Sequence, residues 1–523
     1  MSGHPPNRTA PPRARIILSG VRIGPSGPVG DVVVDSGRIE SIGPRAASTG
    51  ADEVVAGTDL TVLPGLVDAH VHLSQWALAQ RRVDVSAATS PHALVDLVVQ
   101  DVRRRPRPAG ELVTAHGFRG ADWSGEPDGD LFERALPGRR VLAISNDLHT
   151  AWLSPAAARA VDVPLPPSGV AREGTALELV GRLGDEPAEV SDQWAIEAIT
   201  AAAARGVTGL TDFEVADNLG TWTRRAALAG RLPVRVTATV YPEHLEEVLA
   251  RGLRTGDPVA GALGDVVVGP LKVFVDGSLN ARTALCHEPF VGGTDRGVLV
   301  TPEPELVELM TRAHRGGIGS AIHAIGDRAA TIALDAFAAV GCPGRIEHAQ
   351  LMRAEDIARM AGLGLVAGIQ PKHALDDRLV AERLWGDRLA DAFPHGALLS
   401  AGVPIEIGSD APVSPLDPWL GVAAAVHRRI EQDTPWHPEQ RIPVADALAA
   451  AAGGRRTLHV GETADLVVLR GDPARLSPAE LAAPEVVATV AGGRPTWLGG
   501  TVPAGAHDGG APCPPWEPRS GPP

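Results

Sequence analysis

Eight short apolar segments, most of them separated by Ala-rich helical stretches, dominate the middle of this chain of 523 residues. Alternation of short strands with helices is the pattern of βα units, whose strands run parallel. Eight units are the number that closes into an α/β barrel of the (β/α)8 TIM type, with its functional groups at the C-terminal strand ends. An open doubly wound sheet is the competing architecture, but no Gly-x-Gly-x-x-Gly motif follows a strand here. The predicted strands are residues 63–73, 207–212, 234–239, 270–275, 320–323, 344–348, 365–370 and 404–410.

The segments on either side of the barrel pattern are β-rich and are broken by Gly, Pro and Ser turns. Chain ends often lie close together, so both segments are expected to form one discontinuous small β-sandwich domain. The stretch between the first two barrel strands is too long for a simple crossover, and we expect an insertion that shapes the substrate pocket. The predicted parts are a disordered tail at 1–13, sandwich at 14–62, barrel at 63–457 with an insertion at about 77–200, sandwich at 458–502 and a disordered tail at 503–523.

Charge and cysteine content exclude several classes of partner. The net charge of −15 disfavours nucleic acid and anionic membranes, because both would repel an acidic protein. Three scattered cysteines provide neither a disulfide framework nor a Cys-x-x-Cys zinc site, so a reducing, cytoplasmic location is expected. The chain lacks an apolar run of about eighteen residues, so we expect no membrane span. Its first fifteen residues lack the apolar core of a signal peptide.

Residue types that bind metals end four of the predicted strands. Side chains two residues apart on a strand point to the same face, so His70 and His72 can bind one metal ion. Two histidines with no role in metal binding could have the same spacing. His323, His348 and Asp410 end the fifth, sixth and eighth predicted strands. Because the strands of a barrel present these ends at one mouth, the sequence predicts a nitrogen and oxygen site suited to zinc, manganese, iron or cobalt.

Lysine is almost absent from the chain, which contains only Lys272 and Lys372. Lys272 lies in the fourth predicted strand, where burial beside metal cations penalises the ammonium group and favours the neutral amine. A neutral amine can add carbon dioxide to give a carbamate, an anionic ligand that bridges two metals and that arginine cannot supply. We therefore predict a carbamylated Lys272; the alternative is a lysine paired with a local carboxylate such as Asp276.

In chain order, these segments resemble the metal-dependent amidohydrolase superfamily, and within it the amidohydrolase family 3 branch that includes N-substituted formamide deformylases. The resemblance runs from about residue 14 to residue 500 and includes a closing Gly-Glu-Thr-Ala-Asp-Leu-Val segment at 461–467. The resemblance rests on five sequence motifs. They are His-x-His at 70–72, Leu-Lys-Val-Phe-Val-Asp-Gly-Ser-Leu at 271–279 with Arg-Thr-Ala at 282–284, His-Ala-Ile-Gly-Asp-Arg-Ala at 323–329, Arg-Ile-Glu-His at 345–348 and Gly-Ser-Asp-Ala-Pro-Val at 408–413.

The resemblance implies a metal ligand set and a reaction. His70, His72 and Asp410 would hold one divalent ion, usually zinc; a second would lie on His323 and His348, with carbamylated Lys272 as the bridge. A metal-bound hydroxide would attack the scissile carbonyl, and Asp410 would take the proton of the water and deliver it to the leaving nitrogen. Lys272, His323 and Asp410 are therefore the expected catalytic residues. Members of the superfamily bind one ion or two, and the number here stays open.

Two further segments resemble substrate-side segments of the same branch. Asn-Asp-Leu-His-Thr-Ala-Trp implies that Asp147, His149 and Trp152 face the pocket, with an ordinary loop role as the alternative. Gln-Pro-Lys-His, after the seventh predicted strand, places His373 near the barrel mouth. Asn280 stands where many relatives carry Gly, a difference that bears on substrate contacts rather than on metal binding.

The function predicted from these residues is metal-dependent hydrolysis of a non-peptide carbon–nitrogen bond in a small amide, N-substituted formamide or cyclic imide. An aminohydrolase that deaminates a heterocycle is the alternative, but such enzymes commonly use one metal and no bridging lysine. A non-catalytic relative would have lost metal ligands, and none is missing from this sequence. The expected partner is a small amide-type molecule, while the oligomeric state stays open, a homodimer included.

Overall fold

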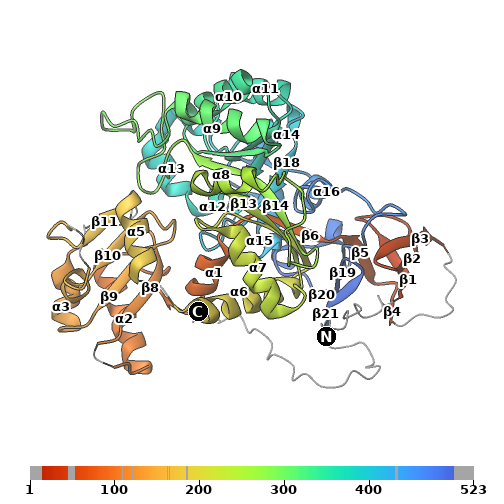
Figure 1. Cartoon of the computed structure of the whole chain (residues 1–523), viewed down its shortest axis with the longest axis horizontal. Helices are drawn as coiled ribbons and strands as arrows, with labels where there is room; N and C mark the ends of the chain where they lie inside the picture. Colours follow the sequence, from red (N-terminus) through yellow and green to blue (C-terminus); the bar gives the residue numbers. More distant parts are fainter. Residues whose placement is uncertain are drawn as a thin grey trace, which may run out of the picture.

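The computed structural model describes residues 15–44, 53–108, 110–120, 123, 125, 127–161, 163, 165–183, 186–429 and 434–499. The predicted tails at 1–13 and 503–523 lie outside these residues. Figure 1 shows three parts, with the barrel in the middle, a small insertion on one side and a sheet built from both ends of the chain on the other.

Eight parallel strands form the central sheet in the order β18-β17-β16-β15-β14-β13-β12-β6, so neighbours in the sheet are also successive barrel strands along the chain. Its two edges meet just beyond β18, where Val71 and Ala411 form a parallel bridge. At this seam Asp410 N donates to His70 O at 2.7 Å and His72 N donates to Ala411 O at 2.8 Å. The predicted eight-stranded barrel is confirmed. Its strands are β6 (Leu66–Val71), β12 (Val207–Asp212), β13 (Arg235–Val240), β14 (Val266–Phe274), β15 (Ser320–Ala324), β16 (Gly344–His348), β17 (Val366–Ile369) and β18 (Ile405–Ile407).

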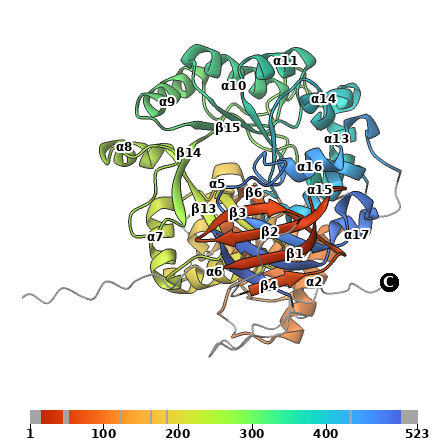
Figure 2. The ribbon, with the colours of Figure 1, turned by 90° about the vertical axis from the view of Figure 1, so that its right-hand side faces the viewer.

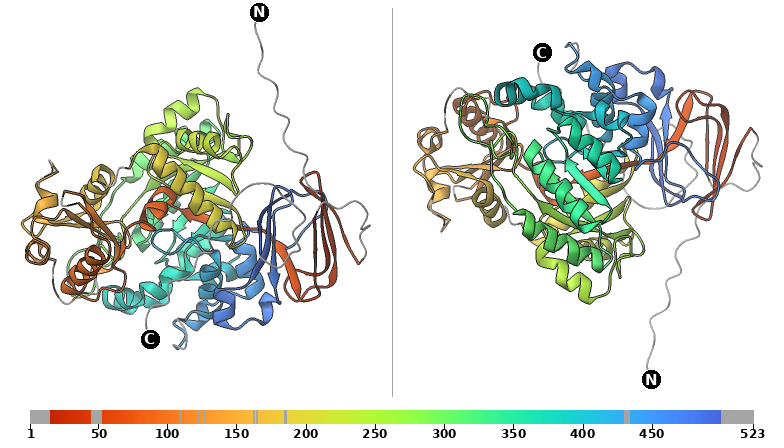
Figure 3. Two further views of the ribbon diagram at one scale, coloured as in Figure 1. Left: turned by 90° about the horizontal axis from the view of Figure 1, so that it is seen from below. Right: turned by 90° about the horizontal axis from the view of Figure 1, so that it is seen from above.

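Helices surround the barrel sheet (Figure 3), and one apolar core joins strands to helices, with Val268, Ile322, Leu306 and Leu334 fully buried in it. Among the described residues, no helix is long and apolar enough to cross a membrane. The helices of this part are α1 (Leu73–Ala79), α6 (Ala188–Ala203), α7 (Asn218–Ala229), α8 (Pro242–Ala250), α9 (Glu303–Arg315), α10 (Asp327–Val340), α11 (Ala354–Gly362), α12 (Pro371–Asp376), α13 (Arg378–Trp385), α14 (His395–Ser400), α15 (Pro418–His427) and α16 (Val444–Ala450), with 3-10 turns η2 (Gly386–Asp391) and η3 (Pro438–Gln440).

The two ends of the chain share one sheet of the order β21-β20-β19-β5-β1-β2-β3, with β4 also paired to β1 (Figure 2). The antiparallel pair β5 and β19 joins the N-terminal strands to the C-terminal ones. Val32 and Val62 share a buried core with Val468 and Val490. Division of this sheet into the two layers of a sandwich stays a prediction. Its elements are β1 (Ile16–Ile23), β2 (Val29–Asp35), β3 (Arg38–Gly43), β4 (Glu53–Ala56), β5 (Leu60–Pro64), β19 (Leu466–Arg470), β20 (Val486–Ala491) and β21 (Arg494–Leu498), with η4 (Pro473–Arg475) and α17 (Pro478–Ala482).

Between α1 and α6 the chain forms a separate five-stranded sheet in the order β11-β10-β9-β8-β7. Helix α6 falls within the predicted range of the insertion, but its residues Ala195 and Ile199 belong to the core of the barrel. The elements of this part are β7 (Val83–Asp84), α2 (Pro91–Arg104), β8 (Val113–Phe118), α3 (Gly129–Ala135), β9 (Val141–Ser145), β10 (Thr150–Leu153), α4 (Pro155–Ala158), β11 (Val170–Arg172) and α5 (Glu173–Leu183).

The predicted strand at 63–73 is divided at Gly65 into two strands of different sheets. Residues before Gly65 end β5 of the terminal sheet, and residues after it begin β6 of the barrel. A Cβ at Gly65 would lie 2.3 Å from Thr208 Cγ2, so only glycine allows the chain to pass this close to β12. The Pro64-Gly65 pair is a turn signal within this segment, and the chain passes from one sheet to the other at this pair, where it packs against the neighbouring strand.

Candidate active site

The seam that closes the barrel brings together a first group of potential metal ligands. His70 lies near the end of β6, His72 follows this strand, and Asp410 follows β18. His72 Nε2 lies 3.3 Å from Asp410 Oδ1, and His70 Nε2 lies 3.5 Å from the same atom. The ligand atoms of the three residues lie within 4.8 Å of one another. The three residues expected to share one ion are therefore adjacent in the structure.

Asp410 also belongs to a second group, with His348 at the end of β16 and His373 in α12. His348 Nδ1 and His373 Nε2 each lie 4.0 Å from Asp410 Oδ2, and all three residues are buried. His348 Nδ1 also lies 2.9 Å from Gln370 Oε1. The sequence predicts a substrate contact for His373, whereas the structure places it among the potential metal ligands.

His348 and Asp410 both have a left-handed backbone, with φ values of 75° and 56°. A non-glycine residue in this region costs about 1–3 kcal/mol and persists only where its surroundings hold it in place. Asp410 is held on both sides, because its N–H donates to His70 O and its carbonyl accepts from Val413 N at 2.8 Å. The strained backbone thus directs both side chains into one cluster.

Electrostatics give most of the cluster the protonation states that suit a metal. Burial acts to raise the pKa of Asp410, but His70, His72 and His373 outweigh it and hold that pKa below its ordinary value. Burial lowers the pKa of His70 and of His348 well below the usual range, so both imidazoles are neutral. His72 differs, because its contact with Asp410 outweighs burial and raises its pKa. A carboxylate among imidazoles is a donor set that divalent metals bind.

Lys272 is fully buried in β14 and lies between two aromatic rings. Its Nζ is 4.7 Å from the ring centroid of Phe213 and 4.8 Å from that of Phe274. Among the described residues, Nζ has no hydrogen-bond partner. Burial lowers the pKa of Lys272 to about 8, so a much larger fraction of the amine is neutral near pH 8 than for an exposed lysine.

His323, at the end of β15, lies beside the second group without joining it. Its ring centroid is 4.4 Å from that of His348, while its Nε2 lies 3.2 Å from Gly277 O and 3.5 Å from Asp276 Oδ1. Asp276 does not serve as a partner for Lys272, because its carboxylate accepts hydrogen bonds from the backbone N–H groups of residues 285, 325 and 326. Burial raises the pKa of Asp276 to about 7.

Glu347 orients His70. Its Oε2 lies 2.7 Å from His70 Nδ1, and its other oxygen accepts from Arg345 Nε. This contact places the proton of a neutral His70 on Nδ1 and turns Nε2 toward Asp410. Sequence analysis did not assign a role to Glu347. The signal that could have identified it is its charge in a strand of a parallel sheet, where continuous apolar residues are usual.

Several buried polar atoms at this barrel mouth lack a hydrogen-bond partner within the described part of the chain. They are His70 Nε2, Lys272 Nζ, His323 Nδ1, His373 Nε2 and Asp68 Oδ2. Buried polar atoms are nearly always paired, because leaving one unpaired costs about 1–3 kcal/mol. Two of these nitrogen atoms, His70 Nε2 and His373 Nε2, lie 3.5 and 4.0 Å from the Asp410 carboxylate, an arrangement that fits a divalent metal, which would supply the missing interactions.

The predicted substrate residues of the insertion lie in two different surroundings. Asp147 accepts hydrogen bonds from Ser145 Oγ at 2.6 Å and from Ser278 Oγ at 2.9 Å, so it reaches the segment after β14. His149 is half-buried and close enough to act on both groups: it opposes the burial that raises the pKa of Asp276 and adds to the burial that lowers the pKa of His323.

Trp152 is fully buried in the core of the insertion, 4.4 Å from Phe132 between ring centroids. The structure therefore does not bring Trp152 to the cluster. Its residue type fits the apolar interior of a small sheet, and its neighbours in β10, Ala151 and Leu153, belong to a second buried cluster on the opposite face of the strand.

The fold and this cluster define a barrel enzyme with a centre able to hold metal. Residues 53–497 match the amidohydrolase family, which is most of the chain. YtcJ of Bacillus subtilis, named a provisional amidohydrolase, is 30% identical over 506 residues, covering 88% of this chain and 94% of its own length. The N-substituted formamide deformylase of Arthrobacter pascens is 28% identical over 515 residues, which cover 88% of this chain and 94% of the deformylase.

Among solved structures, an uncharacterized metal-dependent hydrolase from Pyrococcus horikoshii shares the fold with a TM-score of 0.74 at 24% identity, covering 89% of this chain and 99% of that chain. The protein belongs to the amidohydrolase family, as its sequence segments predict. It is therefore a hydrolase that acts on carbon–nitrogen bonds.

Proposed function

We propose that the protein is a metal-dependent hydrolase that cleaves a non-peptide carbon–nitrogen bond in a small amide, an N-substituted formamide or a cyclic imide. One observation carries this proposal, namely the group of imidazoles around Asp410, two of which have a nitrogen atom without a hydrogen-bond partner among the described residues. The similarity to the N-substituted formamide deformylase supports the choice of substrate class.

Zinc is the ion that we propose, because a set of imidazoles with a carboxylate suits it. His70, His72 and Asp410 would hold the first ion, and His323 and His348 the second, with carbamylated Lys272 between them. The contacts of His373 with Asp410 favour His373 as a further ligand or a positioning residue. Bound in this way, a divalent ion lowers the pKa of a water molecule and polarises a substrate carbonyl.

Asp410 would carry the proton in this reaction. Its pKa is held below the ordinary value, so it is ionised, and a carboxylate oxygen would be available to take the proton of the attacking water. Once the proton has left the water, Asp410 would return it to the nitrogen of the leaving amine. The left-handed backbone at Asp410 would keep this carboxylate in reach of both atoms.

Carbamylation of Lys272 follows from the chemistry of its surroundings. The neutral amine attacks carbon dioxide, a nitrogen–carbon bond forms, and one proton is released as the carbamate appears. The lowered pKa of Lys272 provides the neutral amine, and no hydrogen bond from a described residue has to be broken before Nζ reacts. The cytoplasmic location of the protein stays a prediction, and its oligomeric state, with a homodimer as one possibility, stays open.

Metal analysis of the purified protein, followed by a hydrolysis screen over N-acyl amines, formamides and cyclic imides, tests the proposal. Asp410→Asn should retain a substantial share of the metal and lose turnover by about a hundred- to ten-thousand-fold, the usual contribution of a general acid–base. The matched control is Asp96→Asn on the exposed face of α2, which should change neither quantity. A fully metallated Asp410→Asn variant with wild-type turnover would remove Asp410 from the mechanism.

A further inference from the structure

Strand β6 is irregular beside the proposed metal site. Leu210 of β12 pairs with Asp68, and Asp212 pairs with Val71, so three steps along β6 match two steps along β12. One extra residue in a strand is a β-bulge, which redirects a side chain and disturbs the hydrogen bonds of the ladder. His70 lies within this bulge. The direction of the His70 side chain therefore depends on whatever stabilises the irregular stretch.

Asp68 provides hydrogen bonds to this stretch and to the opposite side of the seam. Its side chain is fully buried, and its Oδ1 accepts from His70 N at 3.3 Å. The same oxygen accepts from Ser409 N at 2.8 Å, across the seam of the barrel. One carboxylate oxygen thus holds the backbone of His70 and that of the residue before Asp410. Within the described part of the chain, Asp68 belongs to neither group of potential metal ligands.

The seam has few other connections. Among the described residues, β6 and β18 meet through an isolated bridge rather than through a continuous ladder. The chain that leaves β18 also passes very close to β6, since a Cβ at Gly408 would lie 2.6 Å from His70 Cβ. At this close approach the amide of Ser409 bonds to the side chain of Asp68 instead of to a strand carbonyl. A side chain therefore does part of the work of a sheet hydrogen bond here.

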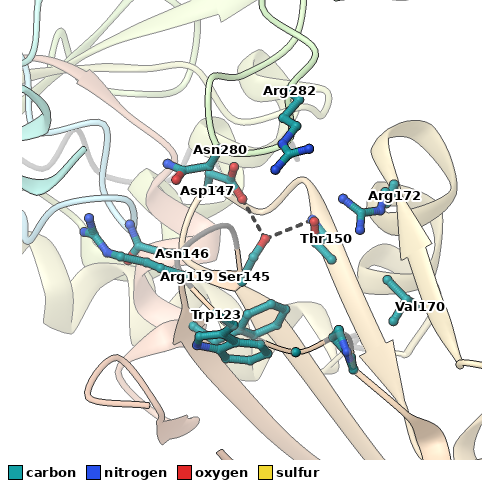
Figure 4. A pocket seen from close by; sticks show the side chains of 14 residues that line it. Arg119, Trp123, Ser145, Asn146, Asp147, Thr150, Val170, Arg172, Asn280 and Arg282 are labelled. Atoms are coloured by element: carbon teal, nitrogen blue, oxygen red, sulfur yellow. Dashed lines mark hydrogen bonds between the residues drawn. The ribbon is translucent and has the colours of Figure 1, made fainter. Parts of the chain in front are cut away.

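The segment that carries Asp410 is held at its far end as well. Asp410 O accepts from Val413 N at 2.8 Å, and Val413 O accepts from Asn146 Nδ2 of the insertion at 2.8 Å. Figure 4 shows Asn146 among the polar side chains that line a cavity between the insertion and the segment after β14. Asp410 has a left-handed backbone, with a φ of 56°, which persists only where the surroundings fix it. Asp68 fixes the flank that faces His70.

We infer that Asp68 is a positioning residue of the site formed by His70, His72 and Asp410. It sets the positions of His70 and Asp410 through their backbone, without touching the ion. Ligands that are fixed before binding lose less conformational entropy when an ion arrives. The inference rests on the proposed function for the presence of the metal, but the hold of Asp68 on the seam is measured in metal-free protein.

The zinc affinities of Asp68→Ala and Asp68→Asn, measured by competition against a chelator, test the inference. Asp68→Ala removes the shared acceptor and should weaken the tighter zinc site by about ten- to a hundred-fold, the usual effect of losing a group that orients ligands. Asp68→Asn keeps an oxygen that can accept from both N–H groups, so its affinity should stay within about threefold of the wild type. Wild-type affinity in Asp68→Ala would overturn the inference. An equal loss in both variants would also overturn it, because the retained acceptor would then have no effect.

The matched control is Asp265→Ala. Asp265 is buried just before β14, at the opposite end of the barrel from the mouth, and its carboxylate accepts from Leu232 N at 3.0 Å. Its loss should lower the free energy of unfolding and leave the zinc affinity unchanged. A zinc affinity that falls equally in Asp265→Ala and Asp68→Ala would show a general loss of stability rather than a positioning role for Asp68.

Hydrogen exchange of the metal-free protein gives a readout that needs neither metal nor turnover. The amides of His70 and Ser409 should exchange at least about tenfold more slowly in the wild type than in Asp68→Ala. If Asp68→Ala does not fold, the wild type alone still decides, because exchange of both amides at the rate of an unstructured peptide would contradict the inference. A wild-type protein that binds no zinc would count against the proposed function, while the exchange data would still report whether Asp68 holds the seam.

Discussion

Replacing Glu347 with Gln should weaken metal binding although Glu347 is not itself among the potential ligands. Its carboxylate is fully buried, with one oxygen 2.7 Å from His70 Nδ1 and the other accepting from Arg345. A glutamine has only one acceptor oxygen. If that oxygen faces His70, the amide NH2 opposes the guanidinium of Arg345. If the amide is flipped, it donates to His70 Nδ1 and forces the imidazole proton onto Nε2, the atom that faces Asp410.

The first orientation of the glutamine keeps only a weaker, neutral hydrogen bond to His70 Nδ1, and the second blocks Nε2, so each impairs His70 as a ligand. Substitution of a group that orients a metal-bound histidine usually costs ten- to a hundred-fold in metal affinity, or about 1.4–2.7 kcal/mol. Because the Gln side chain has nearly the same volume as Glu, the packing of β16 should change little. The loss should consequently appear in the dissociation constant of the metal rather than in the fold.

Competition against a chelator of known affinity measures this constant. The matched control is Glu406→Gln, because Glu406 Oε2 accepts from the same arginine, from Arg345 Nη1 at 2.7 Å, but does not touch His70. Glu406→Gln should keep the affinity within about threefold of the wild type, and Glu347→Gln should lose at least about tenfold. Equal affinities for the two variants would show that the contact with His70 does not orient the ligand.

Three further predictions concern the same barrel mouth. Lys272→Arg should lose metal and activity, because guanidinium cannot form a carbamate; an active, fully metallated variant would contradict this. Metal uptake by metal-free protein at constant dissolved carbon dioxide should quicken as the pH rises through about 8 and level above it, since the neutral amine of Lys272 is the reacting form. Gly408→Ala should lower the free energy of unfolding by about 1–3 kcal/mol in thermal or urea unfolding, because the new Cβ would lie 2.6 Å from His70 Cβ, whereas Gly362→Ala meets no atom within 4 Å.

The barrel could be predicted because its signal is local and repeated. Each strand is a short apolar run, and eight such runs between helices leave few architectures to consider. The division at Gly65 has a local signal, the Pro64-Gly65 turn pair, but this pair does not show that Val62 and Val67 enter different sheets. The close approach of Thr208, which leaves no room for a side chain at position 65, comes from the fold. That contact joins segments far apart in the sequence.

The residues of the candidate active site also differ in how far the sequence could predict their positions. His70, His72, His348 and Asp410 are recognisable because they stand at strand ends, where the geometry of a barrel brings them to one mouth. His373 lies in a helix after a strand, and a residue order alone does not reveal which way a helical turn directs it.

The closing seam explains why the first group of ligands is more fixed than the second. His70, His72 and Asp410 are held to one another by backbone hydrogen bonds of 2.7 and 2.8 Å that also close the barrel, so no side-chain rearrangement can separate these three Cα positions without opening the sheet. Within the described part of the chain, no backbone hydrogen bond joins the members of the second group, and His348 and His373 are oriented through the amide side chains of residues 370 and 350. Preorganised ligands lose less conformational entropy on binding. The seam should consequently hold the first ion more tightly, and in a protein with a single ion the seam is where it should lie.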